Sequence, residues 1–221
     1  MLALYHFAQS TCSIKVRLLL AEKELVWQDN MLVSSEHNHL TDWYLKLNPN
    51  GVVPTLLDDN LPVFESTSIL EYLEDKYTET SFRPFDHYMR SQMRAFLVFV
   101  DVWPTPAVRI PSFQFGGLLR KFSAMSDQEF SELIKKRPLK AEFYQSFNKN
   151  TGFTKDQIFD SLAVISRTAK RMDEMLKKFG GPWLLGTDYT LADIAVLPLI
   201  DRIEDLGLDG LWVEPYPSVS K

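Results

Sequence analysis

Short apolar runs alternate with amphipathic stretches over the first 80 residues. The run 2–7 is apolar and aromatic and too short for a helix, so it predicts a buried strand. After a polar loop, apolar residues recur at helical spacing up to Lys23 and predict a helix that Thr11 or Ser13 can cap. The same reasoning predicts three further strands, over 25–32, 52–57 and 61–64. It also predicts two further helices, one over 34–47 between the first two of these strands and one over 66–77 after the last. This order of elements predicts a small α/β domain.

Beyond the first 80 residues, every periodic segment has helical spacing. Residues 93–100 carry apolar side chains in the i, i+3, i+4, i+7 pattern of one helix face. Between 158 and 176 the apolar steps alternate between four and three, which predicts a long helix that packs against a partner. Residues 114–153 predict one or two short helices. We therefore expect two domains, an α/β domain over 1–79 and an all-helical domain over 87–221.

Composition narrows the class of protein. Of the 221 residues, 45% are hydrophobic and 24% are charged, which supplies core material for one or two packed domains and excludes a disordered or coiled-coil chain. The formal net charge of −5 argues against nucleic acid as a partner, because phosphate backbones select basic surfaces.

The sequence contains a single cysteine, Cys12. A single cysteine excludes an internal disulfide and a metal site built from several cysteines, and it favours a reducing compartment. No spacing of His, Asp and Glu predicts a metal site. The sequence has neither a leader pattern nor an apolar run of about 18 residues, so we expect a cytoplasmic protein that does not insert into membranes.

Four short motifs occur in order along the chain: Ser10-Thr11-Cys12-Ser13, Asn48-Pro49-Asn50-Gly51-Val52-Val53-Pro54, Glu65-Ser66 and Thr190-Leu191-Ala192-Asp193. This ordered set resembles the glutathione transferase superfamily over nearly the whole chain. The resemblance implies a thioredoxin-like first domain, an all-helical second domain, glutathione as co-substrate and a homodimer. The segments 125–130 and 150–153 are most similar to the bacterial β-aryl-etherase-type transferases.

The resemblance implies a glutathione site made of Val53, Pro54, Glu65, Ser66 and His39. In such relatives the peptide bond before the proline is cis, and the backbone of Val53 pairs with the cysteinyl backbone of glutathione like an added strand. Ser66 would hold the γ-glutamyl carboxylate at a helix start, and Glu65 would face the ammonium group. His39 falls where some relatives contact the glycyl carboxylate. Each residue also has a purely structural interpretation: Pro54 as a proline at a strand edge, Ser66 as a helix cap and His39 as a surface histidine.

Three residues compete as the group that activates the thiol of glutathione. A free thiol has a pKa of about 8.5, and lowering it by about two units takes roughly 2.7 kcal/mol of selective stabilisation. Hydroxyl donors at a helix start can contribute to this stabilisation. The resemblance implies Ser10 by analogy with isomerase-like relatives, Cys12 with beta-class enzymes and Ser13 with etherase-type relatives. A reactive Cys12 would instead form a mixed disulfide, or it could be a small buried filler.

An apolar second substrate would lie against aromatic side chains, namely Phe7, Phe99, Trp103, Phe113 and Phe115, although aromatic residues at helical spacing are more often core. The family usually carries a further helix beyond residue 218, and without it one wall of this pocket is expected to be open. The function implied is attack of glutathione thiolate on an electrophilic aromatic molecule, with β-aryl ether cleavage as the most specific form. The alternatives are a maleylacetoacetate-type isomerase and a non-catalytic protein-binding module of the stringent-starvation type.

Overall fold

The computed structural model describes residues 1–220 and separates into two compact units. Unit 1 consists of Met1–Tyr72 and Gly117–Phe153, and unit 2 consists of Leu73–Gly116 and the residues from Thr154 onward. This grouping differs from a division into 1–79 and 87–221, because residues 117–153 belong with the first unit and residues 73–79 with the second. The last residue of the expected second domain, Lys221, lies outside the described residues.

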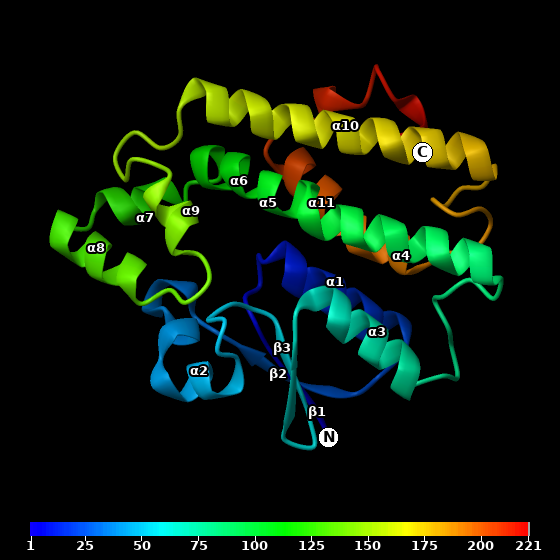
Figure 1. Ribbon diagram of the computed structural model, residues 1–221, viewed down its shortest axis with the longest axis horizontal. Helices are drawn as coiled ribbons and strands as arrows, with labels where there is room; N and C mark the ends of the chain where they lie inside the picture. The colour runs from blue at the N-terminus through cyan, green and yellow to red at the C-terminus, as the bar shows by residue number, and fades with distance from the viewer. Residues whose placement is uncertain (221) are drawn as a thin grey trace. The chain divides into compact units, whose positions relative to one another are not determined.

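Unit 1 is built on a four-stranded sheet (Figure 1). Its strands are β1 (Leu2–His6), β2 (Trp27–Met31), β3 (Thr55–Asp58) and β4 (Leu61–Phe64). The strand order is β2-β1-β3-β4, in which β2 is parallel to β1 and the other two pairs are antiparallel. The helices that accompany the sheet are α1 (Thr11–Glu22), α2 (Asp42–Leu47) and α3 (Ser66–Lys76), of which the last turn, from Leu73, is grouped with unit 2, and short 3-10 turns lie at Ser34–Glu36 and Asn38–Leu40. The predicted α/β domain is confirmed.

The register of the strands brings four loops to one end of the sheet. Tyr5 lies opposite Thr55, and Thr55 lies opposite Phe64. On the other side of β1, His6 lies opposite Met31. Neighbouring strands are about 4.8 Å apart. The segments that follow β1, β2 and β4 therefore lie at the same end of the sheet as the segment that precedes β3.

Two predicted boundaries are wrong for physical reasons. Helix α1 begins at Thr11, and its cap is Ser10, whose side chain accepts a hydrogen bond from the amide of Ser13; neither Thr11 nor Ser13 is the cap. Strand β3 begins only at Thr55. Proline has no amide hydrogen, so Pro54 cannot donate to a neighbouring strand and the ladder starts after it.

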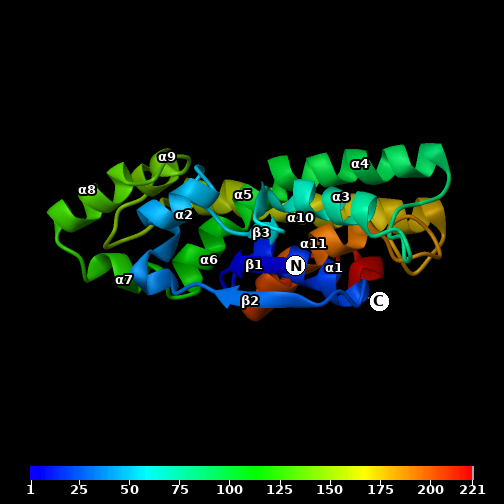
Figure 2. The same ribbon diagram turned by 90° about the horizontal axis from the view of Figure 1, so that it is seen from below.

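Residues 117–153 form three short helices, where one or two were expected: α7 (Leu119–Ser123), α8 (Asp127–Lys135) and α9 (Ala141–Gln145). They share an aromatic core in which the rings of Phe122, Phe130, Tyr144 and Phe147 are spaced 5.6–6.0 Å apart. Figures 1 and 2 both place these helices beside α2, within unit 1.

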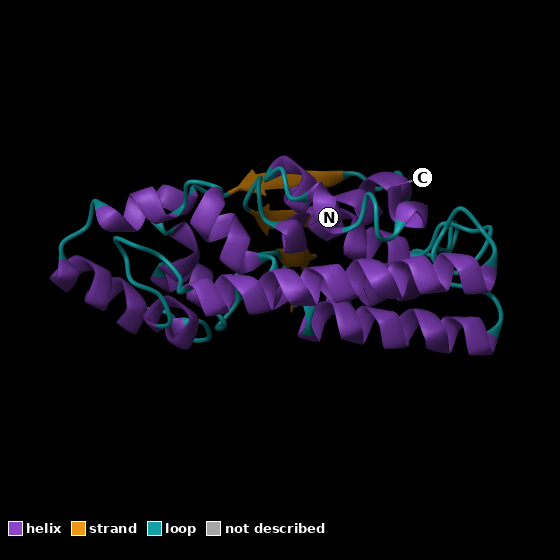
Figure 3. Ribbon diagram, turned by 90° about the horizontal axis from the view of Figure 1, so that it is seen from above, coloured by secondary structure: helices purple, strands orange, loops and turns teal. Residues whose placement is uncertain are grey.

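Unit 2 is all helical. Its elements are α4 (His87–Val102), α5 (Pro104–Ala107), α6 (Arg109–Phe115), α10 (Lys155–Phe179) and α11 (Leu191–Asp205), followed by 3-10 turns at Asp209–Leu211 and Pro217–Ser220. Helix α10 packs along α5 and α6, and Figure 3 shows it running beside α4. The guanidinium of Arg171 on α10 lies 4.1 Å from the ring centroid of Phe99 on α4. Among residues 1–220, no helix is both long enough and apolar enough to cross a membrane.

The start of α11 carries a buried capping box. Asp193 Oδ2 accepts hydrogen bonds from the amide and the hydroxyl of Thr190, at 2.9 and 3.0 Å, and Oδ1 accepts from the amide of Leu184 at 2.9 Å. Burial raises the pKa of Asp193, and these hydrogen bonds oppose that rise. One carboxylate thus satisfies three buried donors.

We expect Asp193→Ala to lower the free energy of unfolding by about 2–4 kcal/mol, because three buried donors lose their acceptor. Urea unfolding followed by circular dichroism measures the change. The matched control is Glu129→Ala, since Glu129 closes an exposed capping box with Ser126 at the start of α8 and water can replace the hydrogen bonds that it accepts, so its loss should cost much less. If both substitutions lowered the free energy of unfolding equally, burial would not be the reason for the large effect at Asp193.

Candidate functional site

The segment before β3 leaves its backbone open to a ligand. The Val53-Pro54 peptide bond is cis, as the resemblance implies. Within residues 1–220, neither the amide nor the carbonyl of Val53 has a protein hydrogen-bond partner. Val53 is half-buried at the end of the sheet where four loops meet. An unpaired donor and acceptor on extended backbone can pair with an added strand.

Two buried side chains hold this segment in place. The Tyr44 hydroxyl donates to the carbonyl of Val52 at 2.7 Å and lies 2.8 Å from the Thr55 hydroxyl. The amide nitrogen of Asn48 donates to the same two groups, both at 3.0 Å. Burial raises the pKa of Tyr44 to about 12, so its hydroxyl remains a donor. Sequence reasoning assigned no role to either side chain, because Asn48 was only one member of a motif and Tyr44 only one residue of the predicted helix 34–47.

Ser66 is the first residue of α3, where the backbone amides of the first turn have no partner within the helix. Its side chain is buried, and no protein group in the described part of the chain bonds its hydroxyl. The preceding residue, Glu65, has a left-handed φ of 68°, and one of its carboxylate oxygens accepts from the side-chain amide of Asn50 at 2.9 Å. Sparsely populated backbone of this kind in non-glycine residues clusters at binding sites. Asn50, a residue absent from the expected site, thus orients Glu65.

The three candidate activating residues differ in their surroundings. Ser10 Oγ accepts from the Ser13 amide at 3.3 Å and keeps its own proton free to donate. Cys12 is half-buried with a free thiol. Ser13 is fully buried, and its hydroxyl has no partner among the described residues. All three stand in the first turn of α1 or at its cap, where the helix dipole favours an anion.

His39 is buried, so the surface alternative is wrong for this residue. Its ring lies 5.0 Å from that of Phe7, edge to face, and its Nε2 lies 3.3 Å from Nη1 of Arg137. Burial, together with the charge of Arg137, lowers the pKa of His39 to about 3, so the ring is neutral at neutral pH. Arg137 was missed because it is 98 residues away in sequence. The contact joins the loop after β2 to the segment after α8.

The expected aromatic pocket falls on both units. Phe7 belongs to unit 1, and the other four residues belong to unit 2. Phe113 is buried in the core of unit 2, and Phe99 packs against Phe96 and Arg171. Trp103 and Phe115 are 54% and 52% exposed. Trp103 and Phe115 are therefore exposed enough to contact an apolar ligand. The pocket as a whole stays a prediction.

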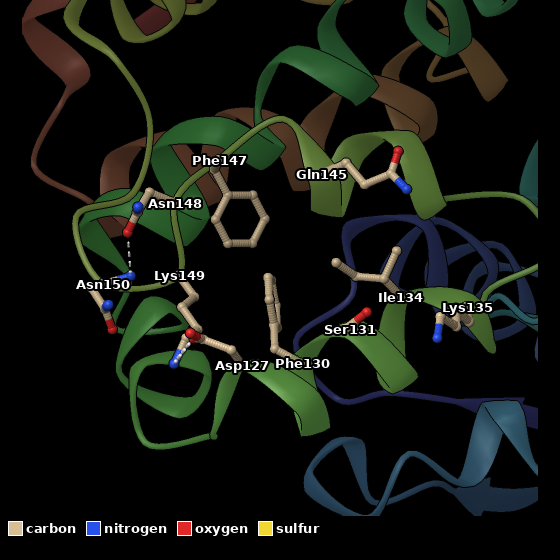
Figure 4. Close-up of a pocket in the computed structure, with 10 residues that line it drawn as sticks. All are labelled: Asp127, Phe130, Ser131, Ile134, Lys135, Gln145, Phe147, Asn148, Lys149 and Asn150. Carbon is tan, nitrogen blue, oxygen red and sulfur yellow. Dashed lines mark hydrogen bonds and ion pairs between the residues drawn. The ribbon is translucent and has the colours of Figure 1, made fainter.

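A separate cavity of about 530 Å³ lies within residues 127–150 (Figure 4). Phe130 and Phe147 face it, and Asp127 and Lys149 at its edge form an ion pair of 3.0 Å. It contains none of the residues at the end of the sheet. Within residues 1–220, no three His, Cys, Asp or Glu side chains group closely enough to hold a metal ion.

A mixed four-stranded sheet with a cis-proline before β3, in a chain that continues into a helical unit, is a thioredoxin-like arrangement with a helical partner. Comparison with known proteins agrees. The family model "Glutathione S-transferase, N-terminal domain" matches residues 9–76, and "Glutathione S-transferase, C-terminal domain" matches residues 155–221.

The relatives extend this result. Protein LigF of Sphingobium sp. strain SYK-6 is 32% identical over 93% of this chain and 80% of its own length. The crystal structure of β-etherase LigF from that strain superposes with a TM-score of 0.88, at 31% identity, covering 99% of this chain and 91% of that one. A probable maleylacetoacetate isomerase of Caenorhabditis elegans is 28% identical over 99% of this chain and 85% of its own length. The chain belongs to the glutathione transferase family.

We expect His39 to make the protein acid-sensitive. Its pKa is about 3 in the folded state and about 6.5 in the unfolded state, so between these values the unfolded state binds more protons and stability falls as the pH falls. Between pH 7.5 and pH 5 this linkage removes about 2 kcal/mol. His39→Gln should therefore lose about 2 kcal/mol less than the parent protein over that interval, measured by urea unfolding at both pH values. An identical pH dependence would show that His39 is not neutral in the folded protein.

Proposed function

We propose that this protein catalyses attack of the glutathione thiolate on an electrophilic carbon of an aromatic compound, most specifically cleavage of a β-aryl ether. One observation carries the proposal: the strand register brings the unpaired backbone of Val53, the start of α3 at Ser66 and the start of α1 at Ser10 to one end of the sheet. Family membership and the similarity to a protein described as a β-etherase support the same reaction class.

Glutathione fits this arrangement group by group. The backbone of its cysteinyl residue pairs with the amide and carbonyl of Val53 as an added strand. Its γ-glutamyl carboxylate accepts hydrogen bonds from the hydroxyl and the amide of Ser66, where the α3 dipole favours negative charge. The ammonium group of the same residue faces the Glu65 carboxylate, which Asn50 orients. Held at both points, the thiol reaches the start of α1.

The chemistry at sulfur needs a stabilised thiolate. Ser10 is the donor we favour, because its oxygen already accepts the Ser13 amide and its proton is left to bond the sulfur. Ser13 is the second candidate, with a buried hydroxyl that has no protein partner in the described residues. Cys12 would change the reaction, since a cysteine thiolate would exchange with glutathione disulfide instead of polarising a bound thiol.

The reaction balances without a further reagent. The thiolate sulfur forms a bond to the carbon that carries the aryl ether oxygen, and the bond between that carbon and oxygen breaks with its electron pair. The aryl oxide leaves and takes a proton from water, and the other product is a glutathione thioether. The exposed rings of Trp103 and Phe115 are the side chains of unit 2 that we assign to the aromatic substrate.

An isomerase is the second candidate, favoured by the maleylacetoacetate isomerase relative. Isomerisation uses the same glutathione site but returns glutathione unchanged, whereas ether cleavage consumes it. We also keep the homodimer and the cytoplasmic location as proposals from the family resemblance. A non-catalytic protein-binding module would use neither glutathione nor these hydroxyls.

We expect the protein to release one phenol for each glutathione consumed from a β-aryl ether with a chromogenic phenol, measured by absorbance and by mass spectrometry of the thioether. Ser66→Ala should raise the KM for glutathione about tenfold or more, because a charge-assisted hydrogen bond is lost. The control is Ser68→Ala, an exposed serine in the same helix turn. Phenol release without thioether, or turnover that returns all glutathione, would refute ether cleavage.

We expect Ser10→Ala to raise the pKa of bound glutathione and to lower kcat, since the thiolate loses a hydroxyl donor. The thiolate absorbs in the ultraviolet, so a pH titration of the complex measures this pKa directly. Cys12→Ser should leave the pKa of bound glutathione unchanged and kcat within about twofold of the parent. A covalent glutathionyl adduct that disappears in Cys12→Ser, with no shift in Ser10→Ala, would assign the reaction to the cysteine.

A further inference from the structure

The cavity of about 530 Å³ in unit 1 is separate from the proposed glutathione site. It lies between α8 and the segment that runs from the end of α9 to residue 150. All of its lining residues fall between the ranges 9–76 and 155–221 that the two family models match. Ligand cavities commonly measure about 300–1,000 Å³. The cavity is therefore large enough to hold a small molecule, and the proposed reaction makes no use of it.

An apolar surface occupies the middle of this cavity. The ring centroids of Phe130 and Phe147 lie 5.9 Å apart at an interplanar angle of 58°, and Ile134 adds an aliphatic side chain (Figure 4). Both rings also pack against Phe122, so the aromatic core of α7 to α9 fixes their positions. Aromatic side chains bind other rings by offset or edge-to-face contacts. The middle of the cavity therefore suits a planar aromatic ring.

Three polar side chains gather at one end of the apolar surface. Figure 4 shows Ser131, Lys135 and Gln145 on the same side of the two rings. Within residues 1–220, neither the hydroxyl of Ser131 nor the side-chain amide of Gln145 has a protein hydrogen-bond partner. Lys135 Nζ forms an ion pair of 3.0 Å with Glu132, which water screens because both side chains are exposed. An ammonium group only donates, so one ligand group that satisfies all three side chains must accept hydrogen bonds and carry negative charge.

The opposite end of the cavity holds charges that already compensate each other. Asp127 and Lys149 form an ion pair of 3.0 Å, and Lys149 Nζ also donates to the carbonyl of Met125. The side-chain oxygen of Asn148 accepts from the backbone amide of Asn150 at 2.9 Å, which holds the turn that closes this end. The lining of the cavity is thus polarised, with a neutral end, an apolar middle and an end that attracts an anion.

We propose that this cavity is a second ligand site of the protein and that it binds an aromatic carboxylate. The aromatic ring of the ligand lies against Phe130 and Phe147. Its carboxylate accepts hydrogen bonds from Ser131, Lys135 and Gln145, the strongest of which is the charge-assisted bond from the ammonium group. The inference is independent of the proposed function, because the lining contains no residue of the proposed glutathione site.

Calorimetric titration with benzoate tests this site. Benzyl alcohol, which lacks the charge, and acetate, which lacks the ring, are the comparison ligands. We expect benzoate to bind with a Kd below about 1 mM and each comparison ligand to bind about tenfold more weakly or worse. The titration is repeated in the presence of S-hexylglutathione, which occupies the proposed glutathione site and the apolar pocket beside it. Benzoate in the cavity should bind equally well under both conditions.

Two substitutions locate the ligand. Ser131→Trp fills the cavity from an exposed position of α8 and should abolish benzoate binding, whereas Ser123→Trp, at an exposed position of α7, should not change it. Lys135→Gln should weaken benzoate about tenfold and leave benzyl alcohol within about twofold, because only benzoate loses a charge-assisted hydrogen bond. Lys136→Gln, the same change at an exposed residue outside the lining, should alter neither ligand.

The absence of benzoate binding at about 10 mM would overturn the proposal. Binding that S-hexylglutathione abolishes and Ser131→Trp leaves intact would assign benzoate to the glutathione site and would overturn it as well. If Ser131→Trp does not fold, the methyl resonance of Ile134 in the isotope-labelled parent protein decides, because benzoate in the cavity must shift it. Failure of the proposed function is distinguishable, since a protein that binds no glutathione would still bind benzoate.

Discussion

The candidate site depends on one buried hydrogen-bond network, in which Tyr44 and Asn48 together hold the carbonyl of Val52 and the hydroxyl of Thr55. Both side chains are fully buried, so each unmade bond would cost about 1–3 kcal/mol. Because side chains satisfy Val52, no strand needs to pair with this segment. The backbone of Val53 is therefore left half-buried and unpaired, in a conformation fixed by its neighbours before any ligand arrives.

Electrostatics at the end of the sheet add to this preorganisation. Helices α1 and α3 both begin there, and each helix start favours negative charge by about 0.3–1 kcal/mol. Arg137 and the nearby lysines contribute further positive charge, while Glu65 is oriented by Asn50. Glutathione, the proposed ligand, would place its γ-glutamyl carboxylate at the start of α3 and its ammonium group near Glu65. The net charge of −5 is a sum over the whole sequence, so it does not show that positive charge gathers at this end of the sheet.

Much of the fold could be predicted from sequence, because it follows from local patterns. The apolar runs gave β1, β2 and β4 to within two residues, and the helical spacing identified α3, α4 and α10. Two boundaries were wrong. The cap of α1 is a local error, because Ser10 and not Thr11 or Ser13 accepts the amide of the first turn. The start of β3 depends on Pro54 and on hydrogen bonds from Tyr44 and Asn48, and those two bonds could not be predicted from local spacing. The two family models and the cis peptide bond agree with the resemblance drawn from four short motifs.

The site was predicted less completely, because several of its contacts join distant residues. His39 could be noted as a candidate, but no pattern in the sequence links it to Arg137, which contacts its ring nitrogen. Asn48 and Asn50 belong to a motif that the sequence analysis quoted, but their hydrogen bonds to Thr55 and to Glu65 could not be predicted from it. Local spacing reveals helix starts and strand ends, whereas a buried cation beside a neutral histidine becomes visible only in three dimensions.

Residues 117–153 complete unit 1 but are synthesised long after its sheet. Unit 1 is discontinuous: its sheet is complete by residue 64, but the segment that packs Pro138 on Gly51 and Arg137 against His39 leaves the ribosome much later. Between these events the chain has already delivered α4, α5 and α6, which belong to unit 2. The loop after β2 therefore emerges long before its partner and stays uncovered in the nascent chain. A fragment that ends at residue 76 would lack Arg137 and Pro138 altogether, and with them the contacts to His39 and Gly51.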